Sequence, residues 1–284
     1  MTSINKIGVV GAGQMGAGIA QVAAMAGFTC SVTDTRSDAL ESSSRNVQKS
    51  LTKLAAKGLI KDAHEIANRI QWHADMDRLS NCDLVIEAVV ENEHVKTQVF
   101  RALDALLKEE AIIASNTSSI SITRLANATT RPAKFIGMHF MNPVPLMKLV
   151  EIIKGHHTSA ETVEVIMGLA HKMGKTPTIA ADYPGFITNR VLTPMINEAF
   201  YALMEGVAHA QDIDTSMRLG CNFPMGPLTL ADFIGLDTCL AIMEVMHKGF
   251  GEDKYRPCPL LRQYVEAGLL GRKSGEGVFK YGEE

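Results

Sequence analysis

The sequence lacks the features that mark secreted, zinc-binding, membrane-spanning and nucleic-acid-binding proteins. Its five cysteines are scattered and form no C-x-x-C pair, so neither a disulfide framework nor a metal site is indicated. No apolar run approaches the length that crosses a bilayer. A net charge of −3 argues against a surface for nucleic acid or an anionic membrane. A strand pattern begins directly after the first few residues and leaves no room for a signal peptide, so we expect a cytoplasmic protein.

The first part of the chain alternates short apolar runs with longer amphipathic segments. The runs are rich in Val and Ile and are bounded by glycine, aspartate or polar turns, as β-strands are. Strands alternating with helices predict βαβ units, in which helices cover both faces of a parallel sheet. The predicted strands are 7–13, 28–34, 82–90, 111–118 and 135–140, with 149–153 and 176–180 as extensions, and the predicted helices are 14–26, 37–57, 62–69, 93–108 and 159–173.

The character of the sequence changes after Tyr183. Residues 186–267 show helical periodicity and no convincing strand, and Pro184-Gly185 fits a linker or hinge. We therefore expect two domains. The first, over 1–183, is a doubly wound α/β domain, and the second, over 184–284, is smaller and all-helical.

A glycine-rich turn follows the first predicted strand. GAGQMG fits G-x-G-x-x-G, in which Gly11 permits the tight turn, Gly13 lets the backbone approach a pyrophosphate, and Gly16 lets the helix pack on the strand. Asp34 ends the second strand, where a carboxylate can accept the adenosine ribose hydroxyls and repel a 2′-phosphate. The alternative is a turn needed only for packing. The pattern predicts a Rossmann-type domain that prefers NAD to NADP, a preference that Arg36 softens.

Two titratable side chains lie in apolar runs of the stretch GMHFMNPVPLMKLVEI. His139 and Glu151 fit a strand core poorly unless each has a partner. One interpretation is a structural histidine bonded to a backbone carbonyl, with a glutamate at a strand end. The other is a catalytic pair, in which a carboxylate orients an imidazole that acts as general base.

A basic stripe recurs along the predicted helix 37–57. Arg45, Lys49, Lys53 and Lys57 follow each other at four-residue intervals and so share one slowly rotating face. The simpler interpretation is a solvated face. The alternative is an anion-binding face beside Ser50, suited to an adenine-nucleotide handle with extra phosphates, such as coenzyme A.

Three further polar groups fall at segment ends, where ligands bind in open α/β sheets. SNTSS (115–119) closes one strand, and its hydroxyls fit either a substrate contact or a helix cap. Glu91 and Lys96 follow another strand, and the alternative for them is a solvated turn with an ordinary exposed lysine. Asn189 opens the helical domain, where it fits a substrate contact or an ordinary polar helix residue.

The chain resembles the 3-hydroxyacyl-CoA dehydrogenase family, most of all the short bacterial 3-hydroxybutyryl-CoA dehydrogenases. The stretches that carry the resemblance span nearly the whole chain in the family's order: GAGQMGAGIAQ, VIEAVVEN, ASNTSSISIT, GMHFMNPVPLMKLVEI, PGFITNR, NFPMGPLTLADFIGLD and LLGRKSGEGVFKY. Two departures are small. Met141 stands where the family usually has phenylalanine, and Gln14 is one of several residues seen in the cofactor turn.

The resemblance implies a role for each matching residue. His139 would be the general base and Glu151 its partner, with Ser118 and Asn189 contacting substrate. Contacts with coenzyme A would come from Ser50 and Lys57, with Lys53 on the same face. The implied cofactor residues are Gly11, Gly13, Gln14, Met15, Gly16, Asp34, Glu91, Lys96, Ser118, Asn142 and Lys273.

The implied reaction is the NAD-dependent oxidation of a short (S)-3-hydroxyacyl-CoA to the 3-ketoacyl-CoA, and its reversal. One alternative is a β-hydroxyacid dehydrogenase that acts on a small free acid, although such relatives use a catalytic lysine. Another is a non-catalytic relative, like the lens crystallin that resembles this family. The resemblance also implies a homodimer through the helical domain, where dense Leu, Ile and Met at 191–204 and 228–246 fit an interface or a tight single-chain bundle.

Overall fold

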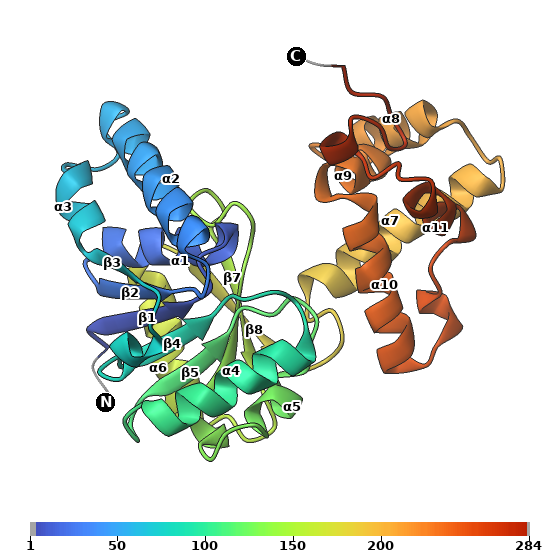
Figure 1. Ribbon diagram of the computed structural model, residues 1–284. Helices are drawn as coiled ribbons and strands as arrows, with labels where there is room; N and C mark the ends of the chain where they lie inside the picture. The colour runs from blue at the N-terminus through green and yellow to red at the C-terminus, as the bar shows by residue number, and fades with distance from the viewer. Residues whose placement is uncertain (1–3, 283–284) are drawn as a thin grey trace. The chain divides into compact units, whose positions relative to one another are not determined.

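The computed structural model describes residues 4–282, which form two compact units, with the boundary in the chain between Tyr183 and Pro184 (Figure 1). The first unit is built on an eight-stranded sheet with the order β3-β2-β1-β4-β5-β6-β7-β8. Its strands are β1 (Lys6–Val10), β2 (Thr29–Thr33), β3 (Ile70–His73), β4 (Leu84–Glu87), β5 (Ile112–Ser115), β6 (Phe135–Phe140), β7 (Leu149–Lys154) and β8 (Thr176–Ala181). The predicted α/β fold class is confirmed.

The sheet departs from the sequence prediction in two places. The pattern misses β3, because the short edge strand IQWH alternates polar and apolar residues and pairs only with β2. The expected parallel sheet is also interrupted, since β7 runs antiparallel to β6. The connection 141–148 is too short for the helical crossover that a parallel neighbour needs. β7 therefore turns back beside β6.

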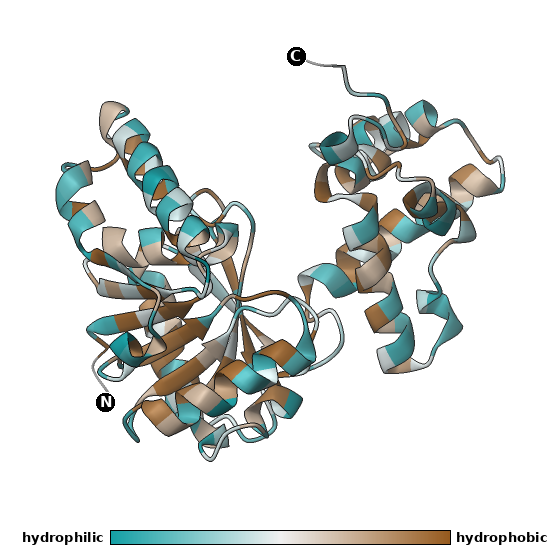
Figure 2. Ribbon diagram, viewed as in Figure 1, coloured by the Kyte–Doolittle hydropathy of each residue, from teal (hydrophilic) through white to brown (hydrophobic). Residues whose placement is uncertain are grey.

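Helices cover both faces of the sheet, as the alternation of segments predicts. One continuous core joins the strands to α1 (Gln14–Met25), α2 (Ser37–Ala56), α3 (Ala63–Asn68) and α6 (Ala160–Lys172). On the other face lie α4 (Glu93–Leu106) and α5 (Ile122–Ala126); Phe100 of α4 meets Phe135 of β6 edge-on, with ring centroids 4.8 Å apart. Figure 2 shows mainly apolar strands beside helices in which polar and apolar residues are mixed.

The second unit contains helices and no strand within its described residues. Its α-helices are α7 (Thr188–Met204), α8 (Ala210–Gly220), α9 (Pro227–Ile234), α10 (Leu236–Phe250) and α11 (Pro259–Glu266). They pack around their own apolar core, which includes Phe200, Leu228 and Leu261. The helical pattern from 226 to 249 reads as continuous, but Gly235, with a φ of 102°, separates α9 from α10. No helix in the described part of the chain is long and apolar enough to span a membrane.

Candidate active site

The glycine-rich turn connects β1 to α1 at the carboxyl end of the sheet. Gly11 has a φ of 102°, and a Cβ there would lie 2.6 Å from the Ala88 carbonyl oxygen. A Cβ on Gly16 would lie 1.8 Å from the Gly11 carbonyl oxygen, so the helix can approach the strand only without a side chain. A Cβ on Gly13 would meet nothing within 4 Å. Gly11 and Gly16 therefore shape the turn, whereas Gly13 leaves room in front of it.

The first turn of α1 suits an anion. Gly13 is the N-cap residue and supplies no capping side chain, and no acidic residue occupies the first turn. The unpaired backbone N–H groups and the positive end of the helix dipole favour a phosphate. Gln14 is exposed and Met15 half-buried at the same end.

Asp34 lies beside the turn, as the sequence predicts. Its Oδ2 accepts a hydrogen bond from the Ala12 N–H at 2.8 Å, and its Oδ1 accepts one from the Arg36 N–H at 2.9 Å. The Arg36 guanidinium pairs with Asp38 at 3.5 Å. These contacts fix the carboxylate at the end of β2, next to the predicted phosphate position.

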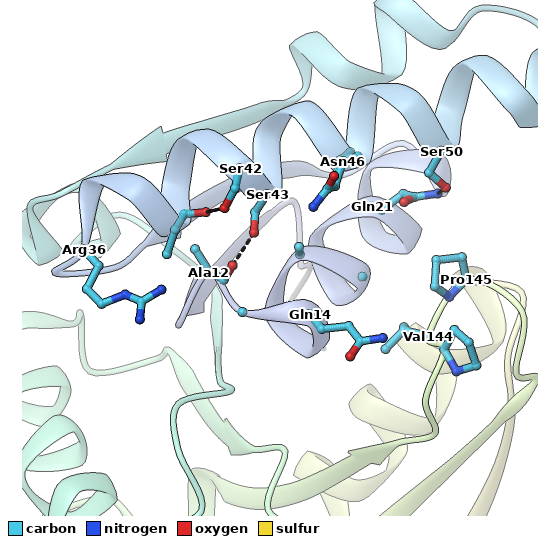
Figure 3. A pocket seen from close by; sticks show the side chains of 16 residues that line it. Ala12, Gln14, Gln21, Arg36, Ser42, Ser43, Asn46, Ser50, Val144 and Pro145 are labelled. Carbon is cyan, nitrogen blue, oxygen red and sulfur yellow. Dashed lines mark hydrogen bonds between the residues drawn. The ribbon is translucent and has the colours of Figure 1, made fainter. Parts of the chain in front are cut away.

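A cavity of about 480 Å³ opens between the glycine-rich turn, α2 and the loop 143–145 (Figure 3). Polar side chains of α2 form one wall, and Ser43 Oγ donates to the Ala12 carbonyl oxygen. Ser50 borders the same cavity and accepts a hydrogen bond from Gln21 Nε2 at 3.0 Å. Figure 3 shows Val144 and Pro145 on the opposite side. The volume and the mixed lining fit part of a nucleotide-like ligand.

The basic stripe of α2 is exposed throughout. Arg45 pairs with Glu41 at 3.8 Å, and Lys49, Lys53 and Lys57 project into solvent. Both interpretations, a solvated face and an anion-binding face, stay open on this geometry.

His139 and Glu151 face each other across β6 and β7. The antiparallel register pairs them directly, and His139 Nδ1 lies 2.8 Å from Glu151 Oε2. His139 is 8% exposed and Glu151 is 1% exposed. A carboxylate in this position holds the ring proton on Nδ1, so Nε2 is the nitrogen that exchanges a proton with a ligand. The short turn that reverses β7 therefore creates the pair.

Ser118 follows β5 in a loop that Glu91 organises. Glu91 Oε1 accepts from the Ser118 N–H at 2.9 Å and Oγ at 3.1 Å, and also from donors on Thr117 and Ser119. Nearby, Asn116 Oδ1 accepts from the Phe140 N–H at 2.8 Å, which ties this loop to the end of the strand that carries His139. The loop and the histidine are thus held to one edge of the sheet.

Lys96 is not the exposed lysine of the simpler sequence interpretation, because its side chain is only 1% exposed. Its Nζ lies 2.6 Å from Glu87 Oε1 and 3.3 Å from Glu91 Oε2. Burial raises the pKa of the Glu87 carboxyl, against the opposing charge of Lys96. Burial alone would also raise the pKa of Glu91, but Lys96 and the donors of residues 117–119 outweigh it and hold that pKa below its ordinary value.

Sequence reasoning missed Glu87, although the signal was present. Glu87 stands at the end of the apolar run LVIE, a carboxylate among buried aliphatic residues, just as Glu151 does. The same argument about an acid in a hydrophobic strand applies to both. Asn116 gave no comparable signal, because an asparagine after a strand is ordinary in turns.

The remaining predicted residues lie in the loop after β6 or in the second unit. Asn142 is exposed in the loop after β6. Asn189 lies in the first turn of α7, and Lys273, in the turn Arg272–Ser274, forms an ion pair with Asp237. The predicted roles of Asn142, Asn189 and Lys273 stay predictions. Among residues 4–282, no group of His, Cys, Asp and Glu is arranged to hold a metal ion.

Comparison with known proteins gives full-length matches. The family model described as 3-hydroxyacyl-CoA dehydrogenase, NAD binding domain, matches residues 6–183, and the C-terminal domain model of the same family matches residues 185–281. A probable 3-hydroxybutyryl-CoA dehydrogenase of Deinococcus radiodurans is 59% identical, over 97% of this chain and 100% of that protein. A 3-hydroxybutyryl-CoA dehydrogenase of Bradyrhizobium diazoefficiens is 54% identical, over 98% of this chain and 96% of that one.

Solved structures agree with these sequence matches. The crystal structure of an (S)-3-hydroxybutyryl-CoA dehydrogenase from Ralstonia eutropha superposes with a TM-score of 0.97 at 48% identity. The match covers 99% of this chain and 100% of that one. The similarity extends through both units.

Proposed function

The chain belongs to the 3-hydroxyacyl-CoA dehydrogenase family, and on that premise we propose that it oxidises short (S)-3-hydroxyacyl-CoA thioesters, chiefly 3-hydroxybutyryl-CoA, with NAD and catalyses the reverse reduction. Its first unit is the family's NAD-binding domain. The observation that carries the proposal is the His139–Glu151 pair, buried at the edge of the sheet that also bears the glycine-rich turn. The alternative, a β-hydroxyacid dehydrogenase, would use a catalytic lysine and would have no need of a His–Glu pair.

The residues present fit NAD. The open space before Gly13, the uncapped first turn of α1 and the fixed Asp34 carboxylate would hold the pyrophosphate and the adenosine ribose. Asp34 also disfavours a 2′-phosphate, so NADP is the weaker cofactor. Bound NAD supplies the hydride acceptor for the oxidation.

In oxidation, His139 Nε2 takes the proton of the substrate's 3-hydroxyl. The Glu151 carboxylate, 2.8 Å from Nδ1, stabilises the imidazolium that forms. In reduction the same nitrogen returns the proton to the developing alkoxide. Ser118 and Asn189 donate hydrogen bonds to the substrate oxygens and orient the reacting carbon. Glu91 supports this step by holding the Ser118 backbone N–H. The single hydroxyl proton of Ser118, which Glu91 accepts in this structure, turns to the substrate when the substrate binds.

The experiment that tests the proposal is NADH oxidation at 340 nm with acetoacetyl-CoA, run beside NADPH and beside free acetoacetate. We expect fast turnover that requires both NADH and the thioester. Turnover of the free acid alone would favour a β-hydroxyacid dehydrogenase. NADH binding without turnover of any substrate would favour a non-catalytic relative.

We propose that the exposed face of α2 next to Ser50 binds the coenzyme A part of the substrate. Lys53→Gln together with Lys57→Gln should raise the KM for acetoacetyl-CoA by about three- to fivefold, as expected for partly screened charge pairs. The KM for NADH should not change. Lys61→Gln removes another exposed positive charge just beyond α2 and serves as the control. An equal rise in the control, or none in the double variant, would place the handle elsewhere.

We further expect a cytoplasmic homodimer that associates through the helical unit. Its supporting observations are apolar side chains exposed on that unit, such as Val191, Val207 and Leu219. The five cysteines are all free thiols, which is typical of a reducing compartment. Sedimentation equilibrium measures the assembly directly.

A further inference from the structure

Glu87, Lys96 and Glu91 form a chain of three charged groups at the carboxyl end of β4. Glu87 is 0% exposed and Lys96 is 1% exposed, so both ions are cut off from water. Glu87 also accepts hydrogen bonds from the Val89 N–H and from Ser115 Oγ, each at 2.7 Å. Every oxygen of this carboxylate therefore has a fixed donor.

Stability alone is a weak reason for such an arrangement. Removing two ions from water costs several kcal/mol per ion, and an apolar pair of similar volume is often equally or more stable. The Glu87–Lys96 pair lies on the edge of the sheet where open α/β folds bind their ligands. A function in the adjoining site accounts for the cost.

Glu91 connects the buried pair to that site. Its Oε2 faces Lys96 at 3.3 Å, while its Oε1 holds the Ser118 N–H and Oγ. The two oxygens of one carboxylate thus point to different partners. A shift of the Lys96 ammonium would change the orientation of Glu91, and with it the position of Ser118.

We propose that Glu87 is a positioning residue for the reaction: its charge anchors the Lys96 ammonium, which orients Glu91 so that Glu91 places Ser118 against the substrate. This inference rests on the proposed function only for the role of Ser118. Without the Glu87 charge, Lys96 has Glu91 as its one remaining anionic partner in this network. Glu91 is then drawn away from the loop 117–119, and the hydrogen bonds to Ser118 weaken.

Glu87→Gln removes the charge while keeping the size of the side chain and its hydrogen-bond partners. The amide oxygen can still accept from Lys96 and the Val89 N–H, and the amide nitrogen can donate to Ser115 Oγ, whose hydroxyl rotates to accept. We expect the turnover number with saturating NADH and acetoacetyl-CoA to fall by about ten- to a hundredfold, as for an ångström-scale misplacement of a substrate-binding group. The dissociation constant for NADH should change less than the turnover number, since the glycine-rich turn and Asp34, which would hold the pyrophosphate and the ribose, are untouched and only the contacts of Lys96, Glu91 and Ser118 shift.

A double-mutant cycle separates this role from an independent one. Lys96→Met replaces the buried ammonium with an apolar side chain of similar length. If Glu87 acts through Lys96, adding Glu87→Gln to Lys96→Met causes no further loss of turnover. Losses that multiply would overturn the proposal, and so would an unchanged turnover number in Glu87→Gln.

Asp104→Asn is the matched structural control. Asp104 pairs with Arg131 at 2.7 Å in the same unit, and both side chains are largely buried, at 11% and 13% exposure. This variant should lower the Tm without lowering turnover per folded molecule. If Glu87→Gln behaves in the same way, its role is structural and the proposal is wrong.

A crystal structure of Glu87→Gln tests the inference without any assay. We expect the contact between Glu91 Oε1 and Ser118 to be lengthened or lost, and an unaltered contact would overturn the inference. If the parent protein turns over none of the substrates, the proposed function fails, and this structure still decides whether Glu87 positions Ser118.

Discussion

His139→Gln is expected to lower the turnover number by about 10²–10⁴-fold, the usual contribution of a general base. The introduced amide can still donate to Glu151 from the buried site, so the fold of β6 and β7 is retained. It cannot accept the substrate's proton at any pH near neutrality. NADH binding should persist, since no contact of the glycine-rich turn involves this side chain. Turnover by steady-state assay and the NADH dissociation constant by fluorescence titration measure the two effects separately.

Glu151 gives the second half of this test. Glu151→Gln should lower turnover less than His139→Gln does, because the imidazole remains but its tautomer is no longer fixed. The double variant should be no slower than His139→Gln alone, since Glu151 acts only through the ring. His171→Gln, on the exposed side of α6, is the control and should leave turnover unchanged. Near-native rates in His139→Gln would mean that another group is the base.

Much of the first unit follows from local sequence signals. Glycines, apolar runs and the acid at the end of β2 each depend on neighbours close in the chain, and these predict the strands, the helices and the cofactor turn. The antiparallel β7 follows from the length of one connection, which periodicity does not measure. The missed strand β3 is short, half-polar and stabilised by one neighbour, so tertiary pairing decides it.

The site residues also divide into those with a local sequence signal and those that depend on tertiary pairing. The sequence shows that His139 and Glu151 are anomalous, but only the register of β6 and β7 makes them a pair. Lys96 reads as an ordinary lysine because its burial depends on Glu87, a residue on a different element. The hydrophobic periodicity of the sequence does not indicate long-range ion pairs of this kind. A carboxylate in an apolar strand is the one local sign of them, and it applies to Glu87 and Glu151 alike.

Gly13→Ala is expected to weaken NADH binding by about a hundredfold, or about 2.8 kcal/mol, while the protein stays folded. Gly13 has a φ of −68°, which alanine adopts without strain, and the added Cβ meets no protein atom within 4 Å. The methyl group occupies the space through which a pyrophosphate reaches the backbone. Fluorescence titration gives the affinity, and the Tm reports the fold.

Gly16→Ala separates this effect from damage to the turn. Its Cβ would lie 1.8 Å from the Gly11 carbonyl oxygen, a backbone atom that moves only if the turn distorts. Both the Tm and the NADH affinity should therefore fall. Gly168→Ala, at an exposed and open position of α6, controls for the substitution itself and should leave NADH binding unchanged. Unchanged NADH affinity in Gly13→Ala would mean that the pyrophosphate does not approach the backbone at Gly13. The added methyl group contacts no protein atom, so a loss of affinity can come only from its clash with the bound ligand.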